Sequence, residues 1–268
     1  MSDPQGRAIA LLAADPASSC LCSDFDGTLA EIVEEPARAA PLPGVAEVLH
    51  ALASSFARVA VISGRPLAFL SAALGPFDAR SRLALFGLYG LERRGASARG
   101  EDDHEPWRRA MAAAIAEITS LPPGCELEDK GLTFAVHWRR APLEGPRLFA
   151  RIEQLAKRHG LVVHPGKQAI EVLPPVAIDK GSVLAALAQG CRTAAFLGDD
   201  VGDLAAFSAL DDFEAHGGRV LRVAVNSSEA PEELLARADL VLDGPTAVLA
   251  FLQAVAKAAE PLKTGQEP

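Results

Sequence analysis

Short apolar segments alternate with longer segments of helical periodicity at both ends of the chain. Residues 20–25, 58–65 and 82–90 are short and almost continuously apolar, which is typical of buried strands. Residues 43–56 repeat apolar side chains at helical spacing, and Pro66 begins a second helical segment. Strands that are apolar on both faces and alternate with helices predict a parallel sheet covered on both sides.

The same alternation returns in the last third of the chain. A helix is predicted over 179–190, where Gly190 ends it, and a closing helix over 245–259. Between them the pattern predicts three more strands, over 193–200, 218–225 and 238–244. We therefore expect an α/β fold with a doubly wound, Rossmann-like parallel sheet.

The middle of the chain follows a different pattern. Residues 93–106 are polar and contain glycine, which is typical of a hinge. A helix followed by two strands then occurs twice, with helices over 107–119 and 145–158 and strands near 125–129, 132–138, 161–164 and 168–173. We expect a core domain of residues 1–95 and 178–268, interrupted by an α+β cap domain of residues 96–177 that determines substrate specificity.

Composition limits the classes of partner. Of the 268 residues 49% are hydrophobic, enough for a large core, and the net charge of −9 argues against nucleic acids and anionic membranes as partners. No apolar run reaches the ~18 residues of a membrane span. The apolar residues after Arg7 are similar to a short signal core, but a predicted core strand follows at once. We expect a cytoplasmic protein and a monomer, with an oligomer left open.

Four cysteines form no C-x-x-C pair and have no histidine at zinc-like spacing. Cys20 and Cys22 lie two apart on a predicted strand, so both side chains lie on one of its faces. We interpret them as buried, reduced thiols, which agrees with a cytoplasmic location.

Polar side chains follow several predicted strands at their carboxyl ends. Asp24 and Asp26 are two apart, so both side chains can face one crevice, and Gly27 permits the turn that follows. Other strand ends or helix starts contribute Ser63, Gly64, Arg65, Lys180, Asp199, Asp200 and Asp203. Because ligands bind beyond the carboxyl ends of parallel strands, we expect these groups to meet at one site.

This set of residues suits phosphoryl transfer. A carboxylate that approaches a phosphate is repelled by about 4 kcal/mol per charge pair at about 4 Å and an effective dielectric constant of about 20. A Mg²⁺ ion shared by Asp24, Asp199 and the phosphate would reverse that repulsion. Lys180 and Ser63 would hold the remaining phosphoryl oxygens, and Asp26 would act as general acid and then as general base.

Two other interpretations compete for these residues. Acidic pairs at strand ends are often no more than solvated turns. A calcium-binding EF-hand loop would place Asp24, Asp26, Thr28 and Glu35 at its positions 1, 3, 5 and 12, but that loop needs glycine at position 6, where this chain has Leu29.

The segments "DFDGT", "SGR", "DKG" and "GDDVGD" resemble the four ordered motifs of the haloacid dehalogenase-like superfamily. The resemblance implies a phosphatase that works through an aspartyl-phosphate, with Asp24 as nucleophile and Asp26 as acid/base. It also implies a catalytic role for Ser63 and Lys180 in binding phosphate, a Mg²⁺ site formed by Asp24, Asp26, Asp199 and Asp203, and substrate contacts from Thr28, Gly64 and Arg65.

The inserted module resembles the cap of the trehalose-phosphatase family in the segments "ELEDKGLTFAVHWR" and "GKQAIEVLPP". The resemblance implies a sugar-phosphate substrate, trehalose 6-phosphate, and substrate-binding roles for Glu128, Lys130, His137, Arg139, Lys167 and Glu171. Carboxylates accept from sugar hydroxyls, and Lys or Arg donate to sugar oxygens. The competing interpretation is a set of surface cross-strand ion pairs, with His137 in a structural role.

The chain departs from the family pattern at three positions. Gly202 replaces threonine and Leu204 replaces an acid in the fourth motif, and Tyr89 replaces a histidine. We expect weaker hydrogen bonding around the metal as a result. Another phosphorylated glycoside as substrate, such as mannosyl- or glucosylglycerate phosphate, and a catalytically silent sugar-phosphate-binding regulator remain alternatives.

Overall fold

The computed structural model describes residues 3–33, 35, 38–77, 81–95, 104–166, 168–227 and 230–260. The chain forms two compact units, one of residues 1–98 and 178–268 and one of residues 99–177. Within the described residues, no helix has the length and apolar character that a bilayer crossing requires.

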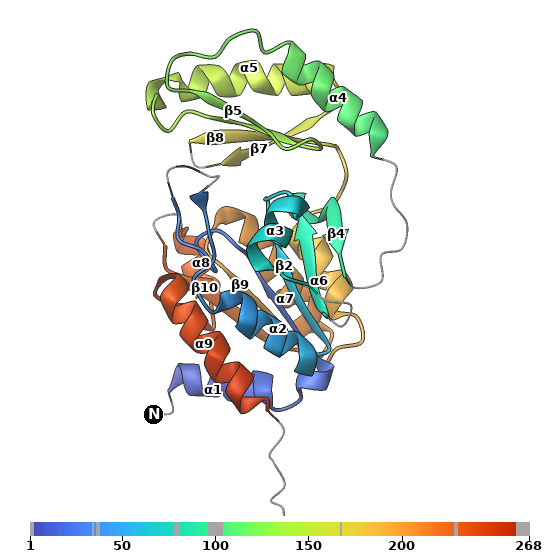
Figure 1. The fold of residues 1–268 in the computed structure, drawn as a ribbon, viewed down its shortest axis with the longest axis vertical. Helices are drawn as coiled ribbons and strands as arrows, with labels where there is room; N and C mark the ends of the chain where they lie inside the picture. Colours follow the sequence, from blue (N-terminus) through green and yellow to red (C-terminus); the bar gives the residue numbers. More distant parts are fainter. Residues whose placement is uncertain are drawn as a thin grey trace, which may run out of the picture. The chain divides into compact units, whose positions relative to one another are not determined.

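The first unit is built on a seven-stranded sheet in the order β11-β10-β9-β1-β2-β3-β4 (Figure 1). The strands are β1 (Ser19–Ser23), β2 (Arg58–Ile62), β3 (Leu83–Gly87), β4 (Glu92–Arg94), β9 (Thr193–Gly198), β10 (Arg219–Val225) and β11 (Leu240–Leu242). All neighbours pair in parallel except β4, which pairs antiparallel with β3. The α/β prediction is confirmed, and the expectation of a purely parallel sheet is corrected at this edge.

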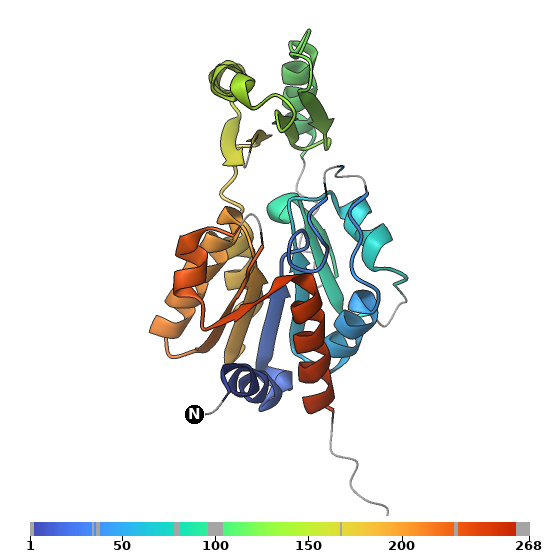
Figure 2. The same cartoon turned by 90° about the vertical axis from the view of Figure 1, so that its left-hand side faces the viewer.

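Helices cover both faces of this sheet (Figure 2). One core cluster joins it to α1 (Pro4–Ala13), α2 (Val45–Ser55), α3 (Leu67–Leu74) and α9 (Gly244–Ala258). A second cluster joins it to α6 (Lys180–Ala188), α7 (Leu204–Ala215) and α8 (Glu232–Arg237). The period of two is visible in β1, where Leu21 belongs to the first cluster and Cys20 and Cys22 to the second.

Several observed elements differ from the sequence-based prediction. Helices α1, α7 and α8 and the edge strand β4 were not predicted. In α7 the buried side chains Ala206, Phe207 and Leu210 have helical spacing. The acidic residues just before them were interpreted as a loop, so the start of the helix was not recognised from the sequence. Strand β4 has the polar sequence "ERR", and its polarity led to the prediction of a hinge from residue 93 onward. An edge strand can be this polar, because one of its sides is open to water.

The second unit has a four-stranded antiparallel sheet in the order β5-β6-β8-β7. Its strands are β5 (Glu126–Asp129), β6 (Phe134–His137), β7 (Val162–Gly166) and β8 (Ala169–Leu173), and its helices are α4 (Glu105–Ala116) and α5 (Gly145–Arg158). Phe134 and Val136 of β6 pack with Ile152 of α5 and Met111 of α4 in one buried cluster. One face of this sheet is therefore covered by helices.

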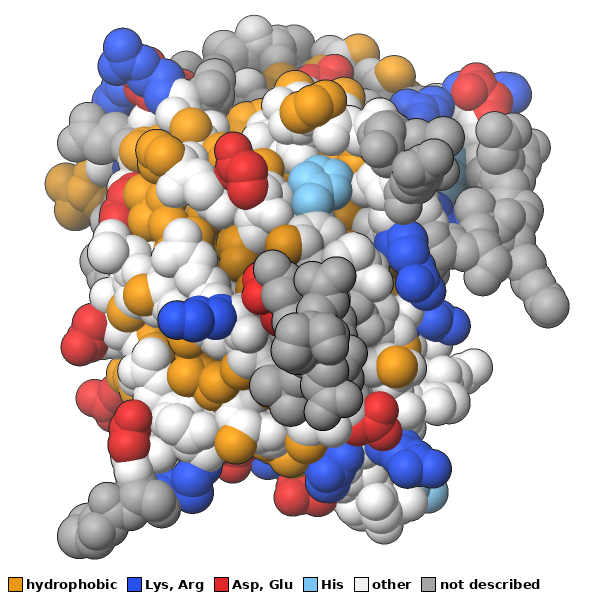
Figure 3. All heavy atoms as spheres, turned by 60° about the horizontal axis from the view of Figure 1, so that its bottom comes forward, with side chains coloured by type: hydrophobic (Ala, Val, Ile, Leu, Met, Phe, Trp, Pro, Cys, Tyr) orange, Lys and Arg blue, Asp and Glu red, His pale blue; other side chains and the backbone are white. Residues whose placement is uncertain are grey.

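Charged side chains of both signs are interspersed with hydrophobic ones on the face shown in Figure 3. Apolar atoms make up a large part of any folded protein's surface, so scattered hydrophobic side chains of this kind need no partner.

Candidate active site

Three neighbouring parallel strands end in polar side chains of the first unit. Asp24 directly follows β1, Asp199 directly follows β9 and Ser63 directly follows β2. The register ties these ends together, because Ser23 lies opposite Leu197, whose carbonyl oxygen accepts the Asp24 N–H at 2.8 Å. The predicted convergence of these strand ends is thus a property of the sheet topology.

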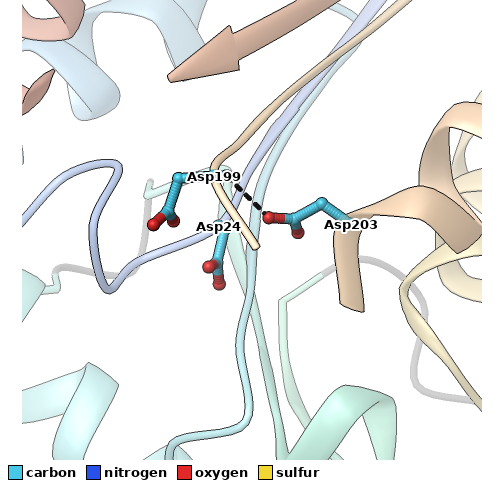
Figure 4. A group of neighbouring side chains, drawn as sticks. All are labelled: Asp24, Asp199 and Asp203. Atoms are coloured by element: carbon cyan, nitrogen blue, oxygen red, sulfur yellow. Dashed lines mark hydrogen bonds between the residues drawn. The ribbon is translucent and has the colours of Figure 1, made fainter. Parts of the chain in front are cut away.

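Three carboxylates meet at this edge. Asp24, Asp199 and Asp203 each offer an oxygen, and these oxygens lie within 4.8 Å of one another. The three residues are 4%, 1% and 0% exposed, so little water screens their mutual repulsion. Figure 4 shows Asp203 reaching the group from the helical turn after β9, while Asp24 and Asp199 come from the strand ends. Such a group requires positive charge nearby.

Lys180 supplies part of that charge from the first turn of α6. Helix α6 begins there because Asp179 caps it, with a carboxylate oxygen that accepts the Ser182 N–H at 2.7 Å. The Lys180 Nζ atom lies 2.7 Å from Asp203 Oδ1 and 3.1 Å from Asp24 Oδ1. The lysine is 2% exposed, so these are buried ion pairs.

Asp203 also closes the loop that contains Asp199. Its Oδ2 atom accepts the backbone N–H of Asp199 at 2.8 Å and that of Asp200 at 3.0 Å. A Cβ at Gly198 would lie 2.3 Å from this carboxylate, so only glycine fits there. Because Asp203 already accepts from two amides and from Lys180, Asp24 and Asp199 offer more free lone pairs to a cation.

The carboxylate of Asp199 is held by hydroxyl groups from two other loops. Thr28 donates to Oδ1 at 3.2 Å and Ser227, which follows β10, donates to Oδ2 at 2.7 Å. Thr28 was predicted to bind substrate, and in the structure its buried hydroxyl contacts Asp199. Sequence reasoning missed Ser227, because a serine in a polar loop carries no signal until β10 lies beside β9.

Asp26 does not belong to the group of three carboxylates. Its carboxylate forms a bidentate pair with Arg65, with Nε–Oδ2 and Nη2–Oδ1 distances of 2.7 and 2.6 Å. The guanidinium of Arg65 in turn lies 4.7 Å from the ring centroid of Phe69, which holds it in place. A metal-ligand role for Asp26 and a substrate contact for Arg65 stay predictions.

The loop after β2 is packed against a strained turn. Leu88 and Tyr89 have φ values of 48° and 60°, a left-handed conformation that is costly for residues with side chains. The Tyr89 N–H donates to the Ser63 carbonyl oxygen at 2.9 Å. A Cβ at Gly64 would lie 2.8 Å from the Tyr89 hydroxyl, so this tyrosine holds the backbone of the loop in place. Ser63 is 1% exposed.

Burial and crowding shift the pKa values of these groups. Burial raises the pKa of Asp24 well above its usual value, that of Asp199 to about 7 and that of Asp203 to about 8. Burial opposes the charge on Lys180, yet the carboxylates that it contacts raise the pKa of its ammonium group well above the usual value. Shifts in these directions are expected where several acidic side chains are buried close together around a single lysine.

The face of the second unit's sheet that points away from α4 and α5 carries another polar cluster. Glu128 on β5 and Glu171 on β8 both lie opposite Ala135 on the central strand β6. Lys130 Nζ lies 2.8 Å from Glu171 Oε1 and 3.9 Å from Glu128 Oε2, and His137 Nε2 lies 3.1 Å from Glu128 Oε2.

The structure thus brings together four of the six predicted cap residues. Arg139 is exposed in the turn after β6, and Lys167 lies outside the described residues. The substrate-binding roles of all six stay predictions.

Comparisons with known proteins agree on one family. The family model for trehalose-phosphatase matches residues 22–239. The chain is 32% identical over 217 residues to the trehalose-6-phosphate phosphatase of Escherichia coli K12, with 77% of this chain and 78% of that protein covered. It is 30% identical over 270 residues to the trehalose-phosphate phosphatase of Mycobacterium tuberculosis H37Rv, with 94% of this chain covered but 64% of that protein.

A solved structure shares the fold. The C-terminal domain of C. albicans trehalose-6-phosphate phosphatase superposes with a TM-score of 0.72 at 22% identity, with 94% of this chain and 96% of that one covered. The family match covers both the strand ends that carry the buried carboxylates and the sheet that carries the second polar cluster. The chain therefore belongs to the trehalose-phosphatase family.

Proposed function

We propose that this chain is a Mg²⁺-dependent phosphatase that hydrolyses trehalose 6-phosphate to trehalose and phosphate. The observation that carries the proposal is the buried group of Asp24, Lys180, Asp199 and Asp203 at the carboxyl ends of adjacent parallel strands. Family membership and the names of the relatives support the choice of substrate.

The charge of the site favours a divalent cation. Lys180 contacts three carboxylates, those of Asp24, Asp200 and Asp203, and a phosphate would add further negative charge. Mg²⁺ binds oxygen ligands and is usually held by one or two carboxylates together with substrate phosphate and water. Asp24 and Asp199, whose carboxylate oxygens lie close together, are the residues that would hold it. The bound ion would offset the repulsion between Asp24 and the incoming phosphate.

The chain's own residues would then carry the reaction. The Asp24 carboxylate attacks phosphorus and the bond from phosphorus to the sugar oxygen breaks, while Asp26 gives that oxygen a proton. Water next attacks the aspartyl-phosphate and gives its proton to Asp26, which restores both carboxyl groups and releases phosphate. Lys180 and Ser63 would hold the equatorial phosphoryl oxygens.

The polar sheet face of the second unit would recognise the sugar. Glu128, Lys130 and Glu171 combine acceptors and a donor on one face, with the lysine ammonium within 4 Å of both carboxylates. Each of these side chains is between 10% and 31% exposed, so the sugar's hydroxyl groups would have polar groups to bind that are still partly open to solvent.

A substrate panel tests the activity. With Mg²⁺ present, the protein should release phosphate from trehalose 6-phosphate much faster than from glucose 6-phosphate or sucrose phosphate. Comparable rates on all three would overturn the assignment of substrate, while a preference for mannosyl- or glucosylglycerate phosphate would favour a related glycoside phosphatase. Release from none of them would favour a silent sugar-phosphate-binding regulator.

The same panel tests the second unit. Glu171→Gln should raise KM for trehalose 6-phosphate by roughly tenfold, because a charge-assisted hydrogen bond is lost, and should leave the rate on an aryl phosphate unchanged. An equal loss on both substrates would remove the sugar-binding role. A cytoplasmic location and a monomeric state stay predictions, which cell fractionation and light scattering test.

A further inference from the structure

The carboxylate of Asp199 is held by hydroxyl groups that lie outside the acidic loop of residues 199–203. The Ser227 hydroxyl donates to one of its oxygens at 2.7 Å and the Thr28 hydroxyl to the other at 3.2 Å. A Cβ at Gly27 would lie 2.0 Å from Asp199 Oδ2, so the carboxylate is packed against a turn that only glycine can form. Two separate segments of the chain, the turn after β1 and the loop after β10, therefore determine the direction in which this side chain points.

These restraints come from outside the acidic loop. The fourth motif of this chain has Gly202 where the family pattern has threonine, and the sequence alone predicted weaker hydrogen bonding around the metal. In the structure, a hydroxyl from the loop after β10 and another from the turn after β1 contact the carboxylate that follows β9. Hydroxyl groups distant in sequence thus supply hydrogen bonds that the motif itself lacks.

The geometry leaves room for a cation. A carboxylate has about four acceptor positions, and the two hydroxyl donors occupy one on each oxygen. The remaining lone pairs stay available, while the plane of the carboxylate is held by both bonds. The shorter contact, from Ser227, is the stronger restraint, because a 3.2 Å O–H···O contact lies beyond the usual range.

We propose that Ser227 is a positioning residue for the metal site, acting through the Asp199 carboxylate. The proposal rests on the proposed function, since it assumes that Asp199 binds a divalent cation. Hydrogen bonds that orient a metal ligand typically affect metal affinity by about 10- to 100-fold. Ser227 is a half-buried residue whose hydroxyl contacts the carboxylate, so its substitution should alter the site and leave the fold intact.

The test measures metal binding without turnover. Ser227→Ala and Ser227→Thr are titrated with Mg²⁺ by calorimetry, and the Mg²⁺-dependent rise in Tm is recorded in parallel. Ser227→Ala should bind Mg²⁺ about 10- to 100-fold more weakly than the unchanged protein, and Ser227→Thr, which keeps the hydroxyl, should restore most of the affinity. Ser54→Ala is the matched control, because its exposed hydroxyl donates to the Ala51 carbonyl oxygen of its own helix, α2.

Each outcome separates the two proposals. Equal Mg²⁺ affinity for Ser227→Ala and the unchanged protein would overturn the role of Ser227 and leave the phosphatase assignment standing. A rise in KM with unchanged Mg²⁺ affinity would also overturn it, because Ser227 would then contact the substrate. If the unchanged protein binds no Mg²⁺, the metal site of the proposed function fails, and the role of Ser227 fails with it. The Tm without metal shows that each variant is folded.

Discussion

The two units each carry a cluster of acidic and basic side chains, and the clusters differ in burial. In the first unit, the side chains of Lys180 and Asp24 are 2% and 5% exposed. In the second unit, those of Lys130 and Glu128 are 10% and 31% exposed. The first cluster has strongly shifted pKa values, whereas the second lies on a sheet face that water reaches.

The difference in burial suits the two clusters to different tasks, catalysis in the first unit and substrate recognition in the second. Charges deep in the protein interact strongly, so their positions and protonation states are set before a ligand arrives, which suits bond making and breaking. Partly exposed charges interact less strongly with one another than fully buried ones and exchange partners at lower cost, which suits recognition of hydroxyl groups. The experiments below break or sharpen this contrast.

The largest effect is expected from Asp24→Asn. The amide cannot act as the nucleophile, so the rate of phosphate release should fall by at least about 10⁴-fold. Circular dichroism and the Tm should show a retained fold, because the change removes one of several crowded carboxylates. A variant that keeps a substantial rate would exclude an aspartyl-phosphate at this position.

Next comes a matched pair of lysine substitutions. Lys180→Met leaves buried carboxylates without their partner and should lower the free energy of unfolding by about 3–5 kcal/mol. Lys130→Met in the second unit should cost no more than about 1 kcal/mol, because its partners can turn to water. Urea unfolding of both variants measures the contrast, and equal costs would show that burial does not distinguish the clusters.

The pair of Asp26 with Arg65 gives a smaller kinetic effect. Arg65→Lys keeps the charge and loses the two-pronged contact, so kcat should fall roughly 10- to 100-fold with little change in KM. The expectation from sequence, in which Arg65 contacts the substrate, requires a rise in KM instead. Steady-state kinetics on trehalose 6-phosphate distinguishes the two roles.

The smallest effect is a dependence of metal binding on pH. Burial raises the pKa of Asp199 to about 7 in the folded protein, so protons compete with Mg²⁺ below that value. The apparent Mg²⁺ affinity should fall by about tenfold from pH 7.5 to pH 6. Calorimetric titrations at both pH values measure it, and an affinity that is independent of pH would contradict the shift.

The raised pKa of Asp199 also makes the stability of the folded protein depend on pH. A folded-state pKa above the unfolded value means that the folded protein holds its proton more tightly, so the contribution of Asp199 is fully present below the unfolded pKa. That contribution is lost as pH rises through about 7. Without Mg²⁺, the Tm should therefore contain a component that declines from about pH 4 to pH 7, and Mg²⁺ should remove most of the decline.

Much of the core was predictable because its signals are local. Continuous apolar runs predicted β1, β2, β3, β9, β10 and β11, and the predicted helix over 145–158 matches α5 residue for residue. Predicted strands ran too far at their carboxyl ends, as over 58–65, where β2 stops at Ile62. The residues after Ile62 form a turn that is held by a contact from another turn, in which the Tyr89 N–H donates to the Ser63 carbonyl oxygen.

The sequence by itself determined the alternation of strands and helices, the inserted module and the acidic and basic residues at the strand ends, because spacing and side-chain chemistry are written along the chain. Only the tertiary structure decided that Asp203 holds Lys180, that Arg65 clamps Asp26 and that Ser227 contacts Asp199. Each of these contacts joins segments that strand order and helix packing bring together. The free energy of such a contact depends on distance and burial in space, which no local spacing in the sequence contains.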